Sequence, residues 1–198
     1  MVTSLHIGIA GTHHTGKTTL VRRIEMELRA TGLIVTRTGG LAKRAAALGF
    51  PKMTRHTTAS TEWIITAGAA DVLQAELAAD VVIVDRTPHD AIAYLLAAHQ
   101  HRNEPIPPAE LDRLVLLADL HNRPAVYLAT VLDPAIPLAT PAGKDPDWTD
   151  TAFRTNVDRR LHQLLDDRGI DHLTVPGDGH AQAVRAAVET ITTAAVTA

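Results

Sequence analysis

The chain has 198 residues, which is enough for one domain with a hydrophobic core of its own. Apolar residues make up 45% of the sequence and charged residues 21%, and these fractions exclude a disordered chain, a collagen and a coiled coil. The formal net charge of -3 argues against broad capture of nucleic acid, because a phosphate backbone calls for a basic surface.

The sequence contains no cysteine, so disulfides, thiolate catalysis and cysteine-based zinc sites are excluded. Its first residues lack the basic and apolar pattern of a secretion signal, and no run of about 20 apolar residues follows. We therefore expect a cytoplasmic protein with a single domain over residues 1–198, without membrane or nucleic-acid partners. The sequence leaves the oligomeric state open, a homodimer included.

Short β-branched runs alternate with longer helical stretches, a pattern typical of a parallel α/β sheet. The expected elements, in chain order, are a strand at 5–10, a helix at 17–30, a strand at 33–36, a helix at 41–48, a long helix at 57–79, a strand at 81–84, helices at 88–99 and 108–121, a strand at 125–129, a helix at 151–167, a strand at 173–175 and a closing helix at 181–193. These elements predict a layered α/β fold around a mostly parallel sheet of five strands.

Two details of this prediction concern packing and one long loop. We expect Met26 and Leu28 to pack in the core. The segment 133–150 cannot form one regular element, and a loop of this length in a compact domain is usually functional or disordered. The residues that break it are Pro134, Pro137, Pro141, Gly143 and Pro146. The buried positions expected in the long helix include Trp63, Ala67, Ala70 and Leu77.

Residues 11–18 read Gly-Thr-His-His-Thr-Gly-Lys-Thr and match the pattern G-x-x-x-x-G-K-[ST] without a mismatch. The motif follows a predicted strand and opens a predicted helix, which is the context that a phosphate-binding loop requires. Its glycines let backbone N–H groups turn toward phosphate oxygens, and the helix directs its positive dipole end at them. The residues expected to bind the nucleotide are Gly11, Thr12, His13, His14, Thr15, Gly16, Lys17, Thr18 and Thr19.

Two side chains of this loop have expected chemical roles. Lys17 would reach the β- and γ-phosphates, and the Thr18 hydroxyl would ligate Mg²⁺. His13 and His14 are interpreted as loop side chains close to the nucleotide, because no further ligands converge on them to form a metal site.

Asp85 and Arg86 directly follow the third predicted strand. In an open α/β sheet ligands bind beyond the carboxyl ends of the strands, so this pair would lie near the phosphate loop if the strands are neighbours. Asp85 could then serve the metal or take a proton from an acceptor hydroxyl, and Arg86 could clamp the acceptor with its planar guanidinium. The alternative for Asp85 is a cap on the helix that begins at Pro88.

Three stretches carry a family resemblance: residues 11–20, residues 84–91 together with Tyr94, and Phe153-Arg154. With them the sequence resembles the P-loop small-molecule kinases, and within these the AAA-domain-labelled families near ribosylnicotinamide kinase and the deoxynucleoside and thymidylate kinases. The resemblance runs along nearly the whole chain. It implies a three-layer P-loop NTPase sandwich with a five-stranded mostly parallel sheet, ATP and Mg²⁺ as cofactors, and a lid at about 133–150.

The resemblance also implies site residues. An Asp-Arg or Glu-Arg pair in those kinases lies between nucleotide and acceptor, which implies catalytic roles for Lys17, Asp85 and Arg86. Lys144 lies where their lids often have an arginine, and Arg154 is another source of positive charge for the phosphates. Several of these kinases place a carboxylate after the second strand, but residues 36–40 contain none. Either Asp85 does the proton work, or the acceptor needs no strong base, or the kinase step has been lost.

An acceptor could lie against Lys43 and Arg44 or against the polar stretch 52–62, with a solvated helix surface and a capped loop as the alternatives. The predicted function is phosphate transfer from ATP to a small acceptor such as a nucleoside or a nucleotide. ATP is preferred because the guanine-reading motif Asn-Lys-x-Asp does not occur. The alternative is a regulatory ATPase or GTPase that acts through a protein partner.

Overall fold

Five parallel strands form the centre of the molecule. The computed structural model describes residues 4–136, 138 and 146–197. The strands are β1 (Leu5–Ala10), β2 (Val35–Thr38), β3 (Val81–Asp85), β4 (Val126–Thr130) and β5 (Leu173–Val175). They are ordered β2-β3-β1-β4-β5, and each neighbouring pair runs parallel. The predicted five-stranded sheet is confirmed, and all of its described pairings are parallel.

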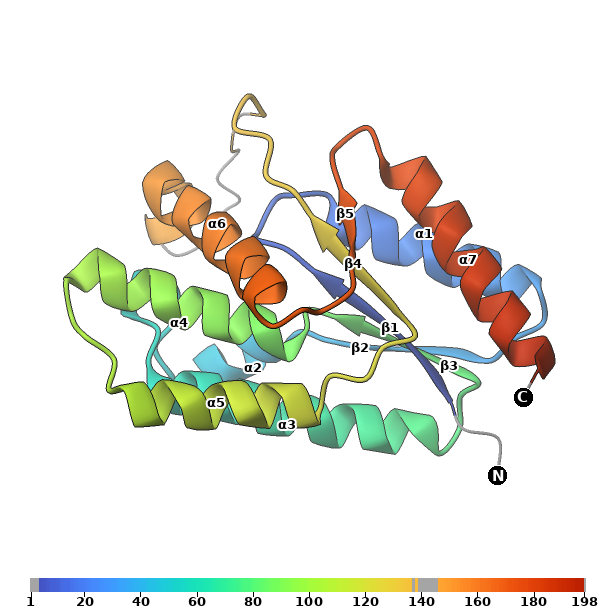
Figure 1. Cartoon of the computed structure of the whole chain (residues 1–198), viewed down its shortest axis with the longest axis horizontal. Coiled ribbons are helices and arrows are strands. Elements are labelled where there is room, and N and C mark those ends of the chain that lie inside the picture. The colour runs from blue at the N-terminus through green and yellow to red at the C-terminus, as the bar shows by residue number, and fades with distance from the viewer. Residues whose placement is uncertain (1–3, 137, 139–145, 198) are drawn as a thin grey trace.

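Helices flank this sheet on both sides and make a three-layer structure (Figure 1). On one side α1 (Lys17–Ala30) packs beside α7 (His180–Thr197). The helices on the other side are α3 (Thr58–Glu76), α4 (Pro88–Arg102), α5 (Pro108–Leu120) and α6 (Thr151–Asp167). The short helix α2 (Leu41–Ala47) packs on α3, and two 3-10 turns, η1 (Met53–Arg55) and η2 (Pro146–Thr149), contact each other.

The central strands are apolar on both faces because helices cover both faces. Ile7 and Ile9 of β1 are fully buried in the cluster formed with α1 and α7, whereas Ala10 belongs to the cluster formed with α4 and α6. In β4, Leu128 and Tyr127 alternate between the same two clusters, as the two-residue period of a strand requires. Each buried isoleucine or leucine contributes about 1.5–3 kcal/mol to the free energy of folding.

The carboxyl ends of β1, β3 and β4 meet at one edge of the sheet. Ile9 pairs with Asp85 of β3 and with Leu128 of β4, so the loop that leaves β1 begins beside the last residue of β3. Ligands of open α/β sheets bind at this edge. The condition stated for the Asp-Arg pair, that its strand should neighbour the strand before the phosphate loop, is therefore met.

The start of β2 and the end of α3 differ from the prediction. β2 begins at Val35, because both backbone groups of Ile34 are bonded to Asp80: its N–H donates to the carboxylate (2.8 Å) and its C=O accepts from the Asp80 N–H (2.9 Å). The prediction that Leu77 is buried is wrong, since α3 ends at Glu76 and Leu77 is 87% exposed.

Two further predictions of burial are wrong, one in α3 and one in α1. Ala70 is exposed, and Ile65 is the large side chain of α3 that lies in the core. Apolar residues occur all around α3, so their spacing could not identify its buried side. In α1, Leu28 is buried as predicted, but Met26 is 63% exposed because it lies on the solvent side of the helix.

The predicted lid is described only at its two ends. Its carboxyl-terminal end forms η2, which packs against η1. Lys144, together with residues 137, 139–143 and 145, lies outside the described residues.

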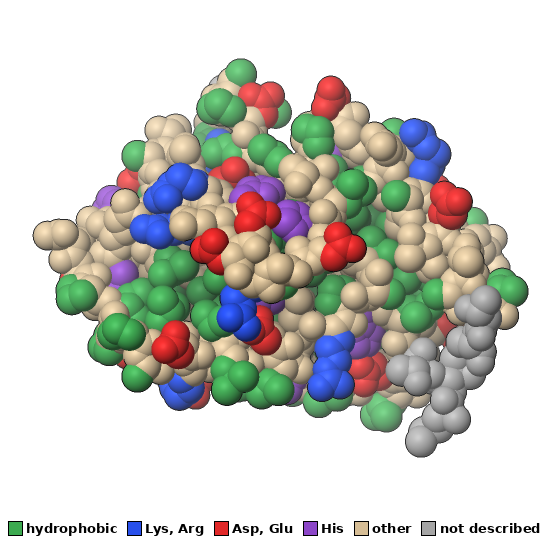
Figure 2. All heavy atoms as spheres, in the orientation of Figure 1, with side chains coloured by type: hydrophobic (Ala, Val, Ile, Leu, Met, Phe, Trp, Pro, Cys, Tyr) green, Lys and Arg blue, Asp and Glu red, His purple; other side chains and the backbone are tan. Residues whose placement is uncertain are grey.

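The described helices include none that is long and apolar enough to span a bilayer. Figure 2 shows acidic and basic side chains interspersed over the visible face, with hydrophobic side chains exposed between α4 and α5.

Candidate active site

The loop between β1 and α1 has the backbone of a phosphate-binding loop. Positive φ angles occur at Gly11 (143°), His14 (64°) and Gly16 (81°). A Cβ atom at Gly11 would lie 1.9 Å from Oγ1 of Thr130, so packing against β4 requires glycine there. Gly16 is the N-cap of α1, and its left-handed conformation turns the chain into the helix. Both glycines of the motif therefore occupy positions that disfavour any side chain.

The backbone of this loop offers hydrogen-bond donors to a ligand. In the part of the chain that the structure describes, no protein acceptor is bonded to the backbone N–H groups of residues 14–18. α1 begins at Lys17, and the first N–H groups of a helix have no acceptor within the helix. Free donors at the positive end of a helix dipole form a binding site for phosphate groups. The loop therefore fits the nucleotide that its sequence predicts.

Lys17 is buried at the base of the loop and is only 6% exposed. Its Nζ donates to the carbonyl of Thr12 and to the hydroxyl of Thr15, the second at 3.2 Å. Burial, together with the nearby charge of Arg86, lowers the pKa of Lys17 to about 7. An anion beside this amine would favour its charged form, so the site is electrostatically suited to a phosphate.

Arg86 has a φ angle of 78°, a left-handed conformation that is uncommon for a residue with a side chain. Its backbone N–H donates to the carbonyl of Ile9 (3.0 Å), and its Nη1 donates to the carbonyl of Gly11 (3.2 Å). The guanidinium carbon lies 5.5 Å from the centroid of the Tyr94 ring. Backbone strain of this kind costs about 1–3 kcal/mol and occurs most often at functional sites, where the surroundings hold the residue in place.

Asp85 and Arg86 share a cleft with the phosphate-binding loop. The cleft has a volume of about 460 Å³, and its walls come from the loop, the start of α2, the end of β3 and η2. The lining residues are His13, His14, Gly16, Lys17, Thr18, Gly40, Leu41, Ala42, Lys43, Asp85, Arg86 and Trp148. Among these described residues Asp85 is the one carboxylate, against two lysines and an arginine. The cleft therefore suits a ligand that carries phosphate groups.

The end of β2 approaches Asp85 closely because it lacks a side chain. A Cβ atom at Gly39 would lie 3.1 Å from Cβ of Asp85. The following residue, Gly40, lines the cleft. Glycine backbone therefore follows β2 where the family resemblance had suggested a carboxylate, and among the described residues that line the cleft Asp85 is the one carboxylate.

His13 joins the phosphate-binding loop to η2. Its Nε2 donates to the carbonyl of Trp148 (3.0 Å), and its Nδ1 therefore accepts from the hydroxyl of Tyr94 (3.0 Å). The ring centroids of His13 and Trp148 lie 4.4 Å apart. Burial lowers the pKa of His13 to about 4, against the effect of the bond to Trp148, so the imidazole is neutral near pH 7.

Arg154 reaches the same loop from α6 and is 3% exposed. Its Nε donates to the carbonyl of His13 (3.1 Å), and its Nη2 donates to the carbonyl of His14 (3.2 Å). Its guanidinium thus holds the backbone of the loop from the side of α6, and the prediction that it binds the nucleotide stays a prediction.

The predicted nucleotide-binding residues fall into two groups. His13, His14, Gly16, Lys17 and Thr18 line the cleft. The others lie elsewhere in or behind the loop: Gly11, Thr12 and Thr15 are buried, Thr19 is exposed on α1, and Arg154 approaches from α6. Thr15 is fixed through its hydroxyl, which lies 2.6 Å from that of Thr130.

Besides Arg86, the sequence offered Lys43, Arg44 and the polar stretch 52–62 for the acceptor, and of these Lys43 alone lines the described cleft. Arg44 instead forms an ion pair with Asp71 and lies over the ring of Trp63. The polar stretch 52–62 contributes no residue to the described cleft. Its side chains form hydrogen bonds with other residues of the protein instead. Thr54 donates to Asp147, Ser60 donates to the carbonyl of Pro51, and His56 lies 3.0 Å from the hydroxyl of Thr61.

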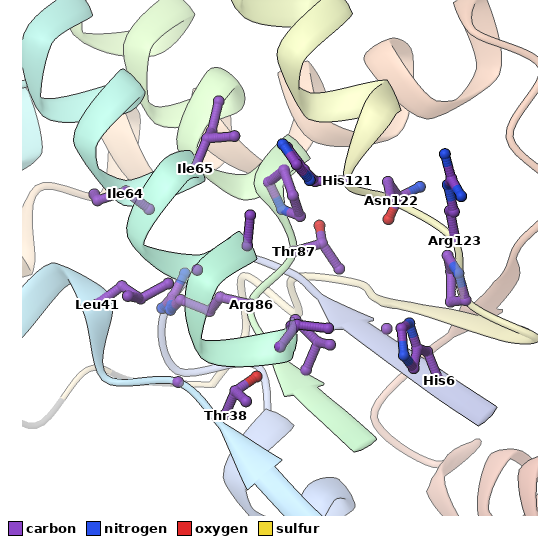
Figure 3. Close-up of a pocket in the computed structure, with 18 residues that line it drawn as sticks. His6, Thr38, Leu41, Ile64, Ile65, Arg86, Thr87, His121, Asn122 and Arg123 are labelled. Carbon is purple, nitrogen blue, oxygen red and sulfur yellow. The ribbon is translucent and has the colours of Figure 1, made fainter. Parts of the chain in front are cut away.

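A second, much smaller cavity lies between α3 and the sheet (Figure 3). Ile64 and Ile65 of α3 and Thr38 of β2 are among its lining residues, and its volume of about 30 Å³ has room for little more than a water molecule. Figure 3 shows the Arg86 side chain directed toward Leu41, and these two residues line both cavities. Of these two cavities, the larger cleft is therefore the one with space for an acceptor.

Sequence reasoning gave no role to two residues that the structure brings to the site. Trp148, which lines the cleft, lies in a segment interpreted as a loop. It is the one aromatic residue of 133–150, and this was the feature of the sequence that could have identified it. Asp90 lies on the first turn of a predicted helix, and the structure places its Oδ1 3.5 Å from Nη1 of Arg86, which precedes that helix.

Comparison with known proteins agrees with this fold. A family model described as an AAA domain matches residues 6–182. Among solved structures, NadR protein in complex with NR aligns with a TM-score of 0.62 and 17% identity, over 96% of this chain and 50% of that chain. NadR protein in complex with NAD and AMP-PNP gives 0.65 and 18%, over 94% and 50%. Thymidylate kinase from Ehrlichia chaffeensis gives 0.61 and 15%, over 96% and 99%. No curated protein sequence matches the chain.

The chain thus spans about half the length of the NadR chains and nearly the full length of the thymidylate kinase. At these identities the structural matches show a shared fold, and the family match covers most of the sequence. Two features of this fold define the site: the phosphate-binding loop between β1 and α1, and the strand order β2-β3-β1-β4-β5. The chain belongs to the AAA domain family of P-loop NTPases.

Proposed function

We propose that this protein is an ATP- and Mg²⁺-dependent phosphotransferase that acts on a small-molecule acceptor. The observation that carries the proposal is a single cleft that is lined both by Lys17 of the phosphate-binding loop and by the Asp85-Arg86 pair. A cleft of about 460 Å³ has room for a phosphate chain and a small acceptor together. Similar structures support the same class, since one is a thymidylate kinase and another contains AMP-PNP.

Four side chains of the cleft have roles in this proposal. Lys17 and the free N–H groups of residues 14–18 hold the β- and γ-phosphates. Arg86 orients the acceptor, and Asp85 accepts the proton of its hydroxyl. Thr18 and Asp85 would hold Mg²⁺, which neutralises negative charge on the phosphates when bound. Phosphoryl transfer depends mainly on such positioning and charge, so few reacting groups are needed.

The identity of the proton acceptor separates this proposal from its alternative. Among the described residues that line the cleft, Asp85 is the one carboxylate. A kinase with this lining needs Asp85 for turnover, or an acceptor whose own phosphate group takes up the proton. A regulatory ATPase or GTPase, the alternative function, needs no small acceptor and responds to a protein partner.

Acceptor-dependent release of ADP tests the proposal. The purified chain is incubated with MgATP and a panel of nucleosides, nucleotides, sugars and cofactor precursors, and ADP is measured with a coupled enzyme assay. We expect at least one acceptor class to raise the rate of ADP release well above the rate with MgATP alone. Calorimetric titrations that detect binding of neither MgATP nor MgGTP to the folded protein would contradict the proposal.

Two variants then examine the roles of the residues. Lys17→Ala should abolish turnover, whereas Asp85→Asn should lower the rate at least about a hundredfold and leave MgADP binding measurable. Asp112→Asn, on the exposed side of α5, is the matched control and should behave as the wild type. An unchanged rate in Asp85→Asn would remove that carboxylate from the mechanism.

A further inference from the structure

The Asp90 carboxylate is buried behind the phosphate-binding loop, where none of the roles proposed above uses it. It is 3% exposed and lies on the first turn of α4. A buried carboxylate is costly unless charges or hydrogen bonds compensate it. Its contacts therefore indicate what the rest of the structure gains from keeping it there.

One oxygen of Asp90 is directed at the start of the phosphate-binding loop. Oδ1 accepts from the backbone N–H of Gly11 (3.0 Å) and lies 3.5 Å from Nη1 of Arg86. The same Nη1 donates to the Gly11 carbonyl (3.2 Å). Asp90 and Arg86 thus hold both polar backbone groups of Gly11 and are paired with each other.

The other oxygen of Asp90 is fixed to the rigid part of the fold. Oδ2 accepts from the backbone N–H of Thr87 (2.8 Å) and from its hydroxyl (3.1 Å). The Thr87 hydroxyl lies 2.6 Å from the hydroxyl of Tyr127, which belongs to the central strand β4. These bonds prevent the carboxylate from rotating, so it can transmit the position of the sheet and of α4 to the loop.

We infer that Asp90 is a positioning residue of the active site, which fixes Gly11 and the guanidinium of Arg86 relative to each other. It touches neither nucleotide nor acceptor and acts through these two residues. The inference rests on the proposed function for the role of Arg86. The effect of Asp90 on the loop, in contrast, concerns nucleotide binding alone. Arg86 holds a strained φ of 78°, and its pairing with Asp90 contributes to keeping it there.

Asp90→Asn tests the inference, with Thr87→Val as its matched control. Asparagine has one acceptor oxygen in place of two, so either Gly11 or Thr87 loses its partner and Arg86 loses its counter-charge. Thr87→Val removes the hydroxyl part of the helix cap but leaves both contacts of Oδ1 intact. Both variants should be less stable to urea than the wild type, because both weaken the same cap.

Titration calorimetry with MgADP separates positioning from capping. We expect Asp90→Asn to bind MgADP roughly ten- to a hundredfold more weakly than the wild type, and Thr87→Val to stay within about threefold. In an Arg86→Gln background the effect of Asp90→Asn should be smaller, because the two residues act on the same peptide group. Equal affinities of Asp90→Asn and the wild type, or equal losses in Asp90→Asn and Thr87→Val, would overturn the inference.

A measurement on the wild-type protein covers the case in which Asp90→Asn does not fold. In amide hydrogen exchange followed by NMR, the Gly11 N–H should be protected, unlike the N–H groups of residues 14–18, which have no described acceptor. Exchange of Gly11 as fast as that of His14 would contradict the inference. Failure of the wild type to bind MgADP or MgATP would instead overturn the proposed function, so the two failures are distinct.

Discussion

Lys17 is uncharged in most molecules of the free protein at pH 8, so a nucleotide that needs its positive charge should bring a proton into the complex. The amine is buried, and burial lowers its pKa to about 7. In a complex, the phosphate groups beside the amine would raise this pKa well above 8. Binding and proton uptake are then linked, and the perturbation to apply is a change of pH.

The size of the effect follows from the pKa of the free protein. With a pKa of about 7, roughly 9% of Lys17 side chains are protonated at pH 8 and roughly 91% at pH 6. Binding should therefore take up about 0.9 proton per nucleotide at pH 8 and about 0.1 at pH 6. If the complex requires the charged amine, MgADP affinity should fall about tenfold from pH 6 to pH 8.

Calorimetry in two buffers with different heats of ionisation, Tris and HEPES, measures the uptake at pH 8. Lys17→Arg is the charge control, because arginine is protonated at every pH of the experiment, and its uptake should be close to zero. His14→Gln, a substitution elsewhere in the lining of the same cleft, is the second control and should leave the uptake unchanged. Tight MgADP binding by the wild type without proton uptake at pH 8 would refute the reasoning, since Lys17 would then be charged before the nucleotide arrives.

Two further predictions concern stability. Gly11→Ala should lower the free energy of unfolding by roughly 2–6 kcal/mol, because the new Cβ would lie 1.9 Å from Oγ1 of Thr130 at a φ of 143°. Gly32→Ala, at a φ of 90° with open space around it, should cost only about 1 kcal/mol, and similar losses in urea denaturation would contradict the packing argument. Burial lowers the pKa of His56 to about 4, from 6.5 in an unfolded chain, so the unfolded state takes up protons first and stability falls as the pH drops from 6.5 toward 4. At pH 5 this loss of stability is about 2 kcal/mol. The difference in unfolding free energy between pH 7 and pH 5 should therefore be smaller by that amount in His56→Gln than in the wild type. An unchanged difference would be evidence against a neutral buried His56.

Local sequence determined the elements and the most specific part of the site. The motif at residues 11–18 includes the turn that follows the strand, the glycines, the lysine and the first residues of the helix. Its structure therefore follows from residues that are neighbours in the chain. β-branched runs predicted five strands, and α6 and β5 have the predicted bounds. In α1, which has one clear apolar side, the bounds and the burial of Leu28 were predicted, although Met26 proved exposed. α3 was not, because its apolar residues surround the helix and Leu77 follows its last turn.

Tertiary structure alone decided which polar residues serve the cleft. Arg154 meets the loop across 141 positions of sequence, and Thr54 is bonded to Asp147 across 93, contacts that no local pattern encodes. The polar stretch 52–62 looked like an acceptor site by composition, yet its described hydrogen bonds close within the protein. Sequence reasoning gave Asp90 no role, but in the structure its carboxylate accepts a hydrogen bond from the Gly11 N–H of the loop. Spacing along a chain fixes dihedral angles and helix sides, whereas the partners of a buried charge depend on which distant segments the packed core brings together.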